Sequence, residues 1–190
     1  MRHPRIYVPP TGATLLIAVL GAAAARADVA GGAFTATGLD TVPRFFHAAS
    51  TLPDGTVMVT GGLGLQLLPP SLFSRNAISF YDPVSGTFGP SYAPLGGRGA
   101  VAPSLLTARS SHTQTTLRDG RVLITGGHIN AGGSSPGTPT ASVEVFDPFT
   151  GVLAAGPSMA AARAMHSATR MPSGAVVVAG GGSWQVFDPV

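Results

Sequence analysis

Three Arg-x-x-His pairs are the residues of this chain whose types and spacing bear most directly on chemistry. Imidazole is the commonest metal ligand among side chains, and a guanidinium binds carboxylate or phosphate groups through parallel hydrogen bonds. Three converging imidazoles would therefore suit a metal ion, and three converging guanidinium groups would suit an anionic ligand. The pairs are Arg44 with His47, Arg109 with His112, and Arg163 with His166.

The recurrence of these pairs favours a structural role instead. We expect each His to bind a neighbouring repeat, and each Arg to bind carbonyl groups and the carboxylate of an Asp-Pro turn. In that turn an Asp side chain accepts backbone hydrogen bonds. The sequence therefore predicts neither a metal site nor a cofactor. The residues assigned to the repeated scaffold are Arg44, His47, Gly61, Gly62, Asp82, Arg109, His112, Gly126, Gly127, Asp147, Arg163, His166, Gly180, Gly181 and Asp188.

The repeat that carries these residues occurs three times, in units of about 44–88, 109–153 and 163–190. The Arg, the Gly pair and the Asp-Pro turn all shift by 65 residues between the first two copies. Between the second and third copies the Arg and the Gly pair shift by 54 residues, but Asp-Pro by only 41. Self-similarity at such a period is typical of propellers, solenoids and other repeat folds.

Each copy has the pattern of an antiparallel sheet. In the second copy, TQTTL and RVLIT are short, rich in β-branched residues and separated by Asp119-Gly120, which predicts a hairpin. A third strand is predicted over residues 142–146, ended by Asp147-Pro148, because Pro cannot continue a central ladder. A fourth is expected after Gly151. We therefore predict an all-β fold of four-stranded antiparallel units.

This skeleton resembles the kelch repeat, on the strength of the Gly pair after an apolar strand and the downstream aromatic-Asp-Pro turn. The Arg-x-x-His and Asp-Gly features resemble bacterial secreted kelch proteins, a group related to the central domain of galactose oxidase. Phe88 and Leu153 stand where the family most often has Trp in the fourth strand. The resemblance implies a kelch-type β-propeller domain over residues 28–190, with about three blades.

Three blades are fewer than the four to eight of typical propellers. Residues 32–37 are expected to form a closing strand beside Val186 and Phe187. Two chains that combine into a six-bladed ring would hide the remaining edges. A truncated reading frame, left as an open arc that self-associates through exposed edge strands, is the interpretation that the sequence favours.

The amino terminus has the pattern of a secretory signal peptide over residues 1–27. Arg2 and Arg5 precede an apolar run that ends in Ala25-Arg26-Ala27. We therefore expect a secreted, periplasmic or extracellular protein, attached to a membrane only if the signal is not cleaved. Without residues 1–27, eight Arg face eight Asp or Glu, so the charge does not favour nucleic acid as a partner. The chain has no Cys and hence no disulfide.

No catalytic constellation is evident in the sequence. A copper-radical centre of the kind found in related propeller oxidases requires a Cys-crosslinked Tyr, which this chain cannot form. Glu144 is the only Glu, so a pair of glutamates for general acid and base catalysis is not available. A binding module is therefore expected rather than an enzyme. The alternative is a truncated or divergent relative of a propeller carbohydrate-active enzyme.

Specificity on a repeat scaffold usually lies where the repeats differ. Here these segments are residues 63–76, 91–108 and 128–141, and we expect them to recognise a protein or a glycan. The first segment is apolar, and packing over its own blade is the alternative to binding. Trp184, the only Trp, is expected to lie in the core, and the alternative is that it stacks on a sugar. The candidate binding residues are Leu67, Leu68, Phe73, His128, Asn130 and Trp184.

Overall fold

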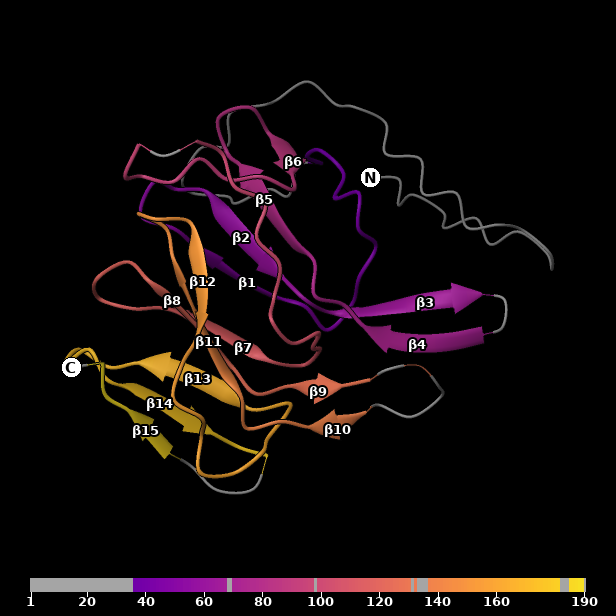
Figure 1. Ribbon diagram of the computed structural model, residues 1–190, viewed down its shortest axis with the longest axis vertical. Helices are drawn as coiled ribbons and strands as arrows, with labels where there is room; N and C mark the ends of the chain where they lie inside the picture. Colours follow the sequence, from indigo (N-terminus) through magenta and orange to yellow (C-terminus); the bar gives the residue numbers. More distant parts are fainter. Residues whose placement is uncertain are drawn as a thin grey trace, which may run out of the picture. The chain divides into compact units, whose positions relative to one another are not determined.

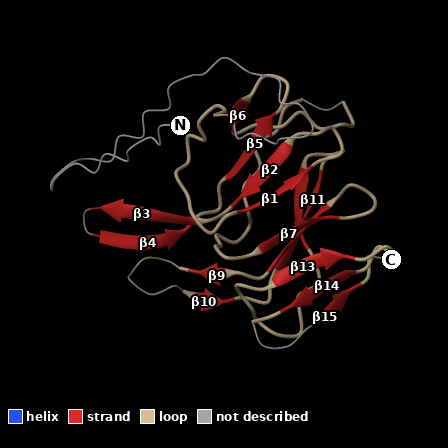
Figure 2. Cartoon of the chain, turned by 180° about the vertical axis from the view of Figure 1, so that it is seen from behind, coloured by secondary structure: helices blue, strands red, loops and turns tan. Residues whose placement is uncertain are grey.

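Figure 1 shows the computed structural model, which describes residues 36–67, 70–97, 99–130, 132, 137–181 and 185–189. Within these residues the secondary structure is entirely β, with strands joined by turns and loops (Figure 2). No helix in the described ranges is long and apolar enough to cross a membrane. The predicted signal peptide lies outside the described residues.

The first sheet contains four antiparallel strands in the order β1-β2-β5-β6. They are β1 (Ala48–Thr51), β2 (Val57–Thr60), β5 (Ile78–Asp82) and β6 (Thr87–Gly89). The turn between β1 and β2 contains Gly55, whose φ of 88° is a backbone conformation that glycine adopts without steric cost. The Asp-Gly signal in the sequence therefore marks the hairpin that the structure contains.

The second sheet repeats this arrangement, and the third contains its first three strands. The second has the order β12-β11-β8-β7, with β7 (Thr113–Thr116), β8 (Val122–Thr125), β11 (Val143–Asp147) and β12 (Val152–Ala155). The third has the order β13-β14-β15, with β13 (Ser167–Arg170), β14 (Val176–Ala179) and β15 (Gln185–Phe187). The prediction of an all-β fold with blades of antiparallel strands is confirmed, and the sheets form a partial propeller.

The predicted closing strand lies mostly outside the described residues. Residues 36 and 37, the part of it that the structure describes, are not in a strand. Its pairing with Val186 and Phe187 therefore stays a prediction.

Two hairpins extend the chain after the first and second Gly pairs, where the sequence analysis expected loops. One is formed by β3 (Leu63–Leu67) and β4 (Pro70–Ser74), the other by β9 (His128–Ile129) and β10 (Thr138–Pro139). Alternation of Leu63, Leu65 and Leu67 with Gly64 and Gln66 is a strand pattern of period two. Both hairpins project on the same side of the molecule (Figure 2).

The hydrophobic core lies between the sheets. Faces of the first and second sheets meet through Phe80 and Phe146, with Tyr92 and Leu105 of the connecting segment between them. The second and third sheets meet through a smaller cluster, centred on Leu123 and Val176. Each sheet buries its apolar face against its neighbour, as successive units of a repeat fold do.

Candidate functional site

The buried histidines connect neighbouring sheets. Nε2 of His112 lies 2.8 Å from Oγ1 of Thr60 in the preceding sheet. Nε2 of His166 lies 2.9 Å from Oγ1 of Thr113 and 3.1 Å from Oγ1 of Thr125. The partners are Thr hydroxyl groups of the neighbouring sheet. Burial, helped by nearby positive groups, lowers the pKa of His112 to about 3, so this imidazole is neutral at pH 7.

The three histidines differ in burial. His47 is exposed, since no described sheet precedes the first one, whereas His112 and His166 are buried. Among the described residues no group of three His, Cys, Asp or Glu side chains could hold a metal ion.

The arginines bind the carbonyl groups of their own sheets. Nη1 of Arg109 donates to the carbonyl oxygens of Gly126, at 2.8 Å, and Ser142, at 3.0 Å. Nη1 of Arg44 donates to Gly61 O at 3.2 Å, and Nη1 of Arg163 to Gly180 O at 2.9 Å. Each Arg therefore fixes the first Gly of the pair that follows the second strand of its own sheet.

The carboxylate partners of these arginines differ from the predicted ones. Arg109 pairs with Glu144 at 2.6 Å, and both side chains are almost fully buried. Arg44 pairs with Asp40 at 3.2 Å. Asp82 and Asp147 instead accept hydrogen bonds from the backbone two residues later, each at 2.8 Å. The predicted Arg contact with these two turn carboxylates is therefore wrong, because Asp40 and Glu144 supply the carboxylates of Arg44 and Arg109 instead.

The Gly pairs bring neighbouring sheets into close contact. The backbone N–H of Gly62 donates to Arg109 O at 2.9 Å, and that of Gly127 to Arg163 O at 2.8 Å. A Cβ on Gly126, whose φ is 62°, would lie 2.5 Å from Arg163 O. Glycine is therefore required here by both its backbone conformation and the approach of the next sheet.

The structure brings together four of the residues that the sequence analysis named for binding. Leu67 ends β3 and is 70% exposed, and Phe73 lies on β4 with the Arg75 guanidinium 4.9 Å from its ring centre. His128 begins β9 and is half-buried, and Asn130, directly after β9, is buried. Leu68 and Trp184 lie outside the described residues.

A single serine joins the two hairpins. The backbone N–H of Ser74 donates to Asn130 O at 2.8 Å, and that of Asn130 donates to Ser74 Oγ at 2.9 Å. Ser74 Oγ in turn donates to His128 O at 3.0 Å. Strands β4 and β9 therefore lie side by side, and the backbone of Asn130 belongs to this junction.

Exposed apolar side chains surround the paired hairpins, and we call this set the paired-hairpin surface. Phe45 is bonded through its backbone to Leu63, which begins the first hairpin. Backbone hydrogen bonds of 2.8 Å and 3.0 Å then link Phe46 to Ser111 and Ser111 to Met165. The surface therefore spans the same end of all three sheets. Its exposed members are Phe45, Phe46, Leu65, Leu67, Ile129 and Met165.

Sequence reasoning missed three members of this surface, Phe45, Phe46 and Met165. A signal was present, since Phe46, Ser111 and Met165 occupy the position before the repeated His and differ among the three copies. All three have positive φ, between 53° and 57°. Non-glycine residues with such a backbone are uncommon and concentrate at functional positions.

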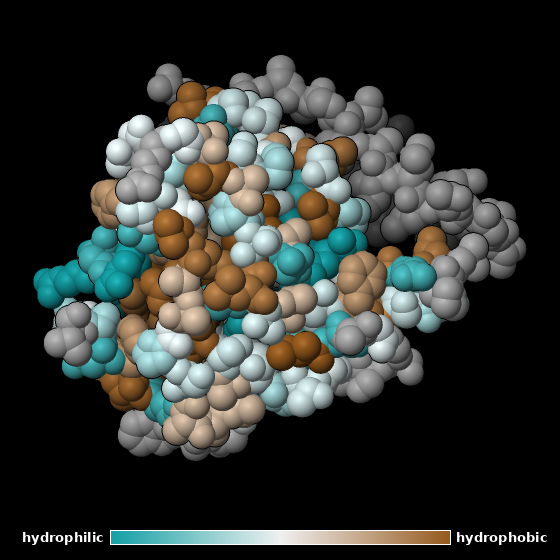
Figure 3. Space-filling model, in the orientation of Figure 1, coloured by the Kyte–Doolittle hydropathy of each residue, from teal (hydrophilic) through white to brown (hydrophobic). Residues whose placement is uncertain are grey.

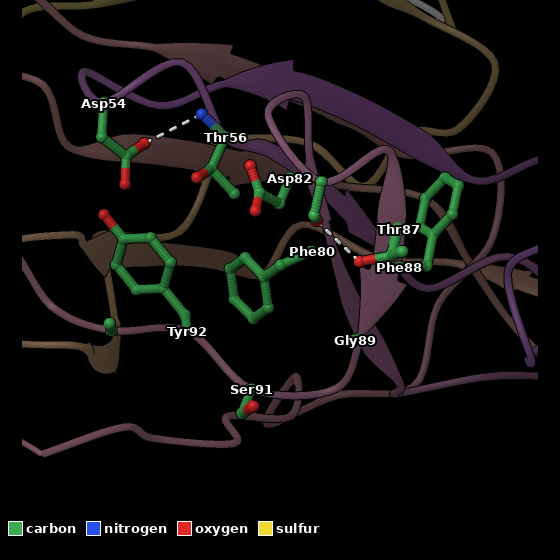
Figure 4. A pocket seen from close by; sticks show the side chains of 11 residues that line it. Asp54, Thr56, Phe80, Asp82, Thr87, Phe88, Gly89, Ser91 and Tyr92 are labelled. Atoms are coloured by element: carbon green, nitrogen blue, oxygen red, sulfur yellow. Dashed lines mark hydrogen bonds between the residues drawn. The ribbon is translucent and has the colours of Figure 1, made fainter. Parts of the chain in front are cut away.

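A pocket of about 300 Å³ lies at the opposite end of the first sheet, beside the turns that join β1 to β2 and β5 to β6 (Figure 4). We call it the Asp54 pocket. Asp54 and Asp82 carry its carboxylates, and the ring of Tyr92 stacks on Phe80 with centroids 5.0 Å apart. It is lined by Asp54, Thr56, Phe80, Asp82, Ser85, Thr87, Phe88, Gly89, Ser91, Tyr92 and Ala93.

The second sheet has a wider groove at the equivalent place, with a volume of about 650 Å³. Val145 replaces Phe80 and Pro157 replaces Tyr92, so the stacked aromatic pair is missing. Arg121 replaces Thr56. Hydrophobic surface gathers over β12 toward the third sheet, on the side of this groove (Figure 3). The stacked pair of Phe80 and Tyr92 is therefore specific to the first of the two.

Comparisons with protein-family models and curated proteins return no match.

Proposed function

We propose that this chain is an exported binding module of the kelch-repeat type that recognises a protein through the paired-hairpin surface. The observation that carries this proposal is the gathering of six exposed apolar side chains at one end of the three sheets. Contiguous exposed apolar surface on a soluble protein marks an interaction site more often than an isolated exposed Leu does. The repeated Gly pairs and Asp-Pro turns support the kelch type.

The chemistry of this surface favours a protein ligand over a glycan. Its exposed members are Phe, Leu, Ile and Met, and aromatic residues and Met are enriched in the cores of protein interfaces. Phe45 and Phe46 pack edge to face, with centroids 5.6 Å apart, and so form a single apolar cluster on this surface.

The rigidity of the support is a second argument. Arg44 and Arg109 each bind several backbone and side-chain groups behind the surface, and Ser74 fixes the two hairpins to each other. A surface held in one arrangement before binding loses less conformational entropy when a partner docks. The scaffold residues thus serve binding without contacting the ligand.

Site-specific photo-crosslinking in the source organism tests this proposal. A photoreactive phenylalanine analogue at Leu67 should yield a discrete adduct with a partner protein. The same analogue at Val84, which is 94% exposed on the turn at the other end of β5, should not. Equal adducts at both positions, or none at Leu67, would contradict the proposal.

The identity of the adduct separates the alternatives. A second copy of the chain crosslinked at Leu67 would assign this surface to self-association instead of a foreign partner. Binding to a glycan array that is lost in Leu67→Asp would replace the protein ligand by a glycan.

A further inference from the structure

The Asp54 pocket has the negative charge that a cation site requires. Two carboxylates, of Asp54 and Asp82, line it, and no Lys or Arg is among its lining residues. One oxygen of each carboxylate accepts a backbone hydrogen bond within its own turn. Thr56 N–H donates to Asp54 Oδ1 at 2.9 Å, and Val84 N–H donates to Asp82 Oδ1 at 2.8 Å. The hydrogen bond from Val84, together with those from Ser85, lowers the pKa of Asp82, so this carboxylate is negatively charged at pH 7.

A buried hydroxyl without a protein partner points to the same place. The Tyr92 side chain is 4% exposed, and its Oη lies beside the Asp54 carboxylate without meeting the geometry of a hydrogen bond. The hydroxyl is directed toward the Asp54 side of the pocket (Figure 4). Burial and the Asp54 carboxylate raise its pKa, so it stays protonated. A buried hydroxyl left without a partner costs free energy, which a ligand group in the pocket would recover.

The second sheet shows which group this carboxylate attracts. Asp119 stands where Asp54 does, and Arg121 stands where Thr56 does. Nε of Arg121 lies 2.6 Å from Oδ2 of Asp119, so the second sheet supplies its own cation. The first sheet has a Thr at that position and an open pocket instead.

We propose that the Asp54 pocket binds a primary ammonium group on a short alkyl chain. The ammonium has three donors, which suit the carboxylates of Asp54 and Asp82 and the Tyr92 oxygen. A volume of about 300 Å³ is at the small end of ligand pockets, which suits a butylammonium-sized group. The source is either a free alkylamine or a Lys side chain of a protein.

Calorimetric titration of the full chain with n-butylammonium tests this site. We expect saturable, salt-sensitive binding that 1-butanol does not reproduce. Asp54→Asn, which keeps the turn acceptor, should weaken it at least tenfold, and Tyr92→Phe several-fold. The matched control is Asp119→Asn in the second sheet, which should leave binding unchanged.

A second variant keeps both carboxylates and so guards against effects on folding. Thr56→Arg introduces the cation that the second sheet has, and it should abolish butylammonium binding. Absence of saturable binding, wild-type affinity in both Asp54→Asn and Thr56→Arg, or equal binding of 1-butanol would each overturn the proposal.

Two further ligands distinguish the sources of the ammonium. Tighter binding of Nα-acetyl-lysine methylamide than of n-butylammonium would assign the pocket to a Lys side chain, and the reverse order to a free alkylamine. The pocket lies at the opposite end of the first sheet from Leu67. A failure of the ammonium proposal would therefore not affect the proposed role of the paired-hairpin surface. A failure of that role would likewise not affect the ammonium proposal.

Discussion

Nε2 of His112 lies 2.8 Å from Oγ1 of Thr60, across the boundary between the first and second sheets. The same hydroxyl donates to Gln114 Oε1 at 2.7 Å, so one Thr holds two residues of the next sheet. His166 repeats the contact one sheet later, with Thr113 and Thr125. The recurrence of Arg-x-x-His therefore follows from how one sheet attaches to the next.

The stability of the fold should fall as the pH falls below 7. Burial lowers the pKa of His112 to about 3 from an ordinary value of 6.5. Between these two values the unfolded chain binds a proton that the folded chain does not, so acid favours unfolding. We expect His112 alone to cost about 2 kcal/mol of unfolding free energy between pH 7 and pH 5.

Urea denaturation at the two pH values measures this loss. His112→Gln removes the titrating ring, so the variant should be less stable at pH 7 but show a smaller difference between the two conditions. An unchanged difference would mean that His112 titrates normally in the folded protein.

Removal of the counter-ion of Arg109 should destabilise the second sheet. The Glu144 carboxylate accepts from the backbone N–H groups of Leu106 and Thr107, at 2.8 Å and 3.0 Å, and pairs with Arg109 at 2.6 Å. Glu144→Gln leaves a buried guanidinium without a negative partner, which costs about 3 kcal/mol. Thermal or chemical denaturation should show this loss.

The exposed pair of Arg121 and Asp119 supplies the control for this prediction. Both side chains are more than 40% exposed, so Arg121→Ala should change the unfolding free energy by less than about 0.5 kcal/mol. Similar losses in the two variants would show that burial does not decide the strength of the Arg109 pair.

Two positive-φ glycines, Gly55 with open space around it and Gly126 in close contact with the next sheet, should lose different amounts of stability when replaced by alanine. The difference distinguishes backbone strain from steric overlap. Gly55→Ala, at φ 88° with open space around its Cβ, should cost about 1 kcal/mol for the left-handed backbone alone. Gly126→Ala adds a contact with Arg163 O and with the His166 ring, and should cost about 3 kcal/mol. Equal losses would mean that the sheets separate easily at this boundary.

The strands could be predicted because their signals are local. Asp119-Gly120 between β-branched runs and Pro148 after an alternating run define β7, β8 and the end of β11 without reference to the rest of the chain. The junction of the hairpins could not be predicted in this way, since Ser74 and Asn130 lie 56 residues apart. Only the folded arrangement brings β4 beside β9.

The carboxylate partners of the arginines could not be predicted from the sequence, because the sheets use different residues to provide them. Ser79 occupies in the first sheet the position of Glu144, and there Asp40 supplies the carboxylate to Arg44 from a different part of the chain. In the third sheet Gln185 occupies this position, and its Oε1 accepts from Ala160 N–H at 3.0 Å, as Glu144 accepts from Leu106. Because the three sheets have Ser79, Glu144 and Gln185 at this position, the sequence shows no recurring motif there.

The affinity of the crosslinked partner for matched surface variants tests the central claim most directly. Leu67→Glu places a charge on the paired-hairpin surface, whereas Val84→Glu places the same charge on a turn at the other end of the sheet. We expect Leu67→Glu to raise Kd at least tenfold and Val84→Glu to leave it within twofold of wild type. Wild-type affinity in Leu67→Glu, with the protein still folded, would contradict a binding role for this surface.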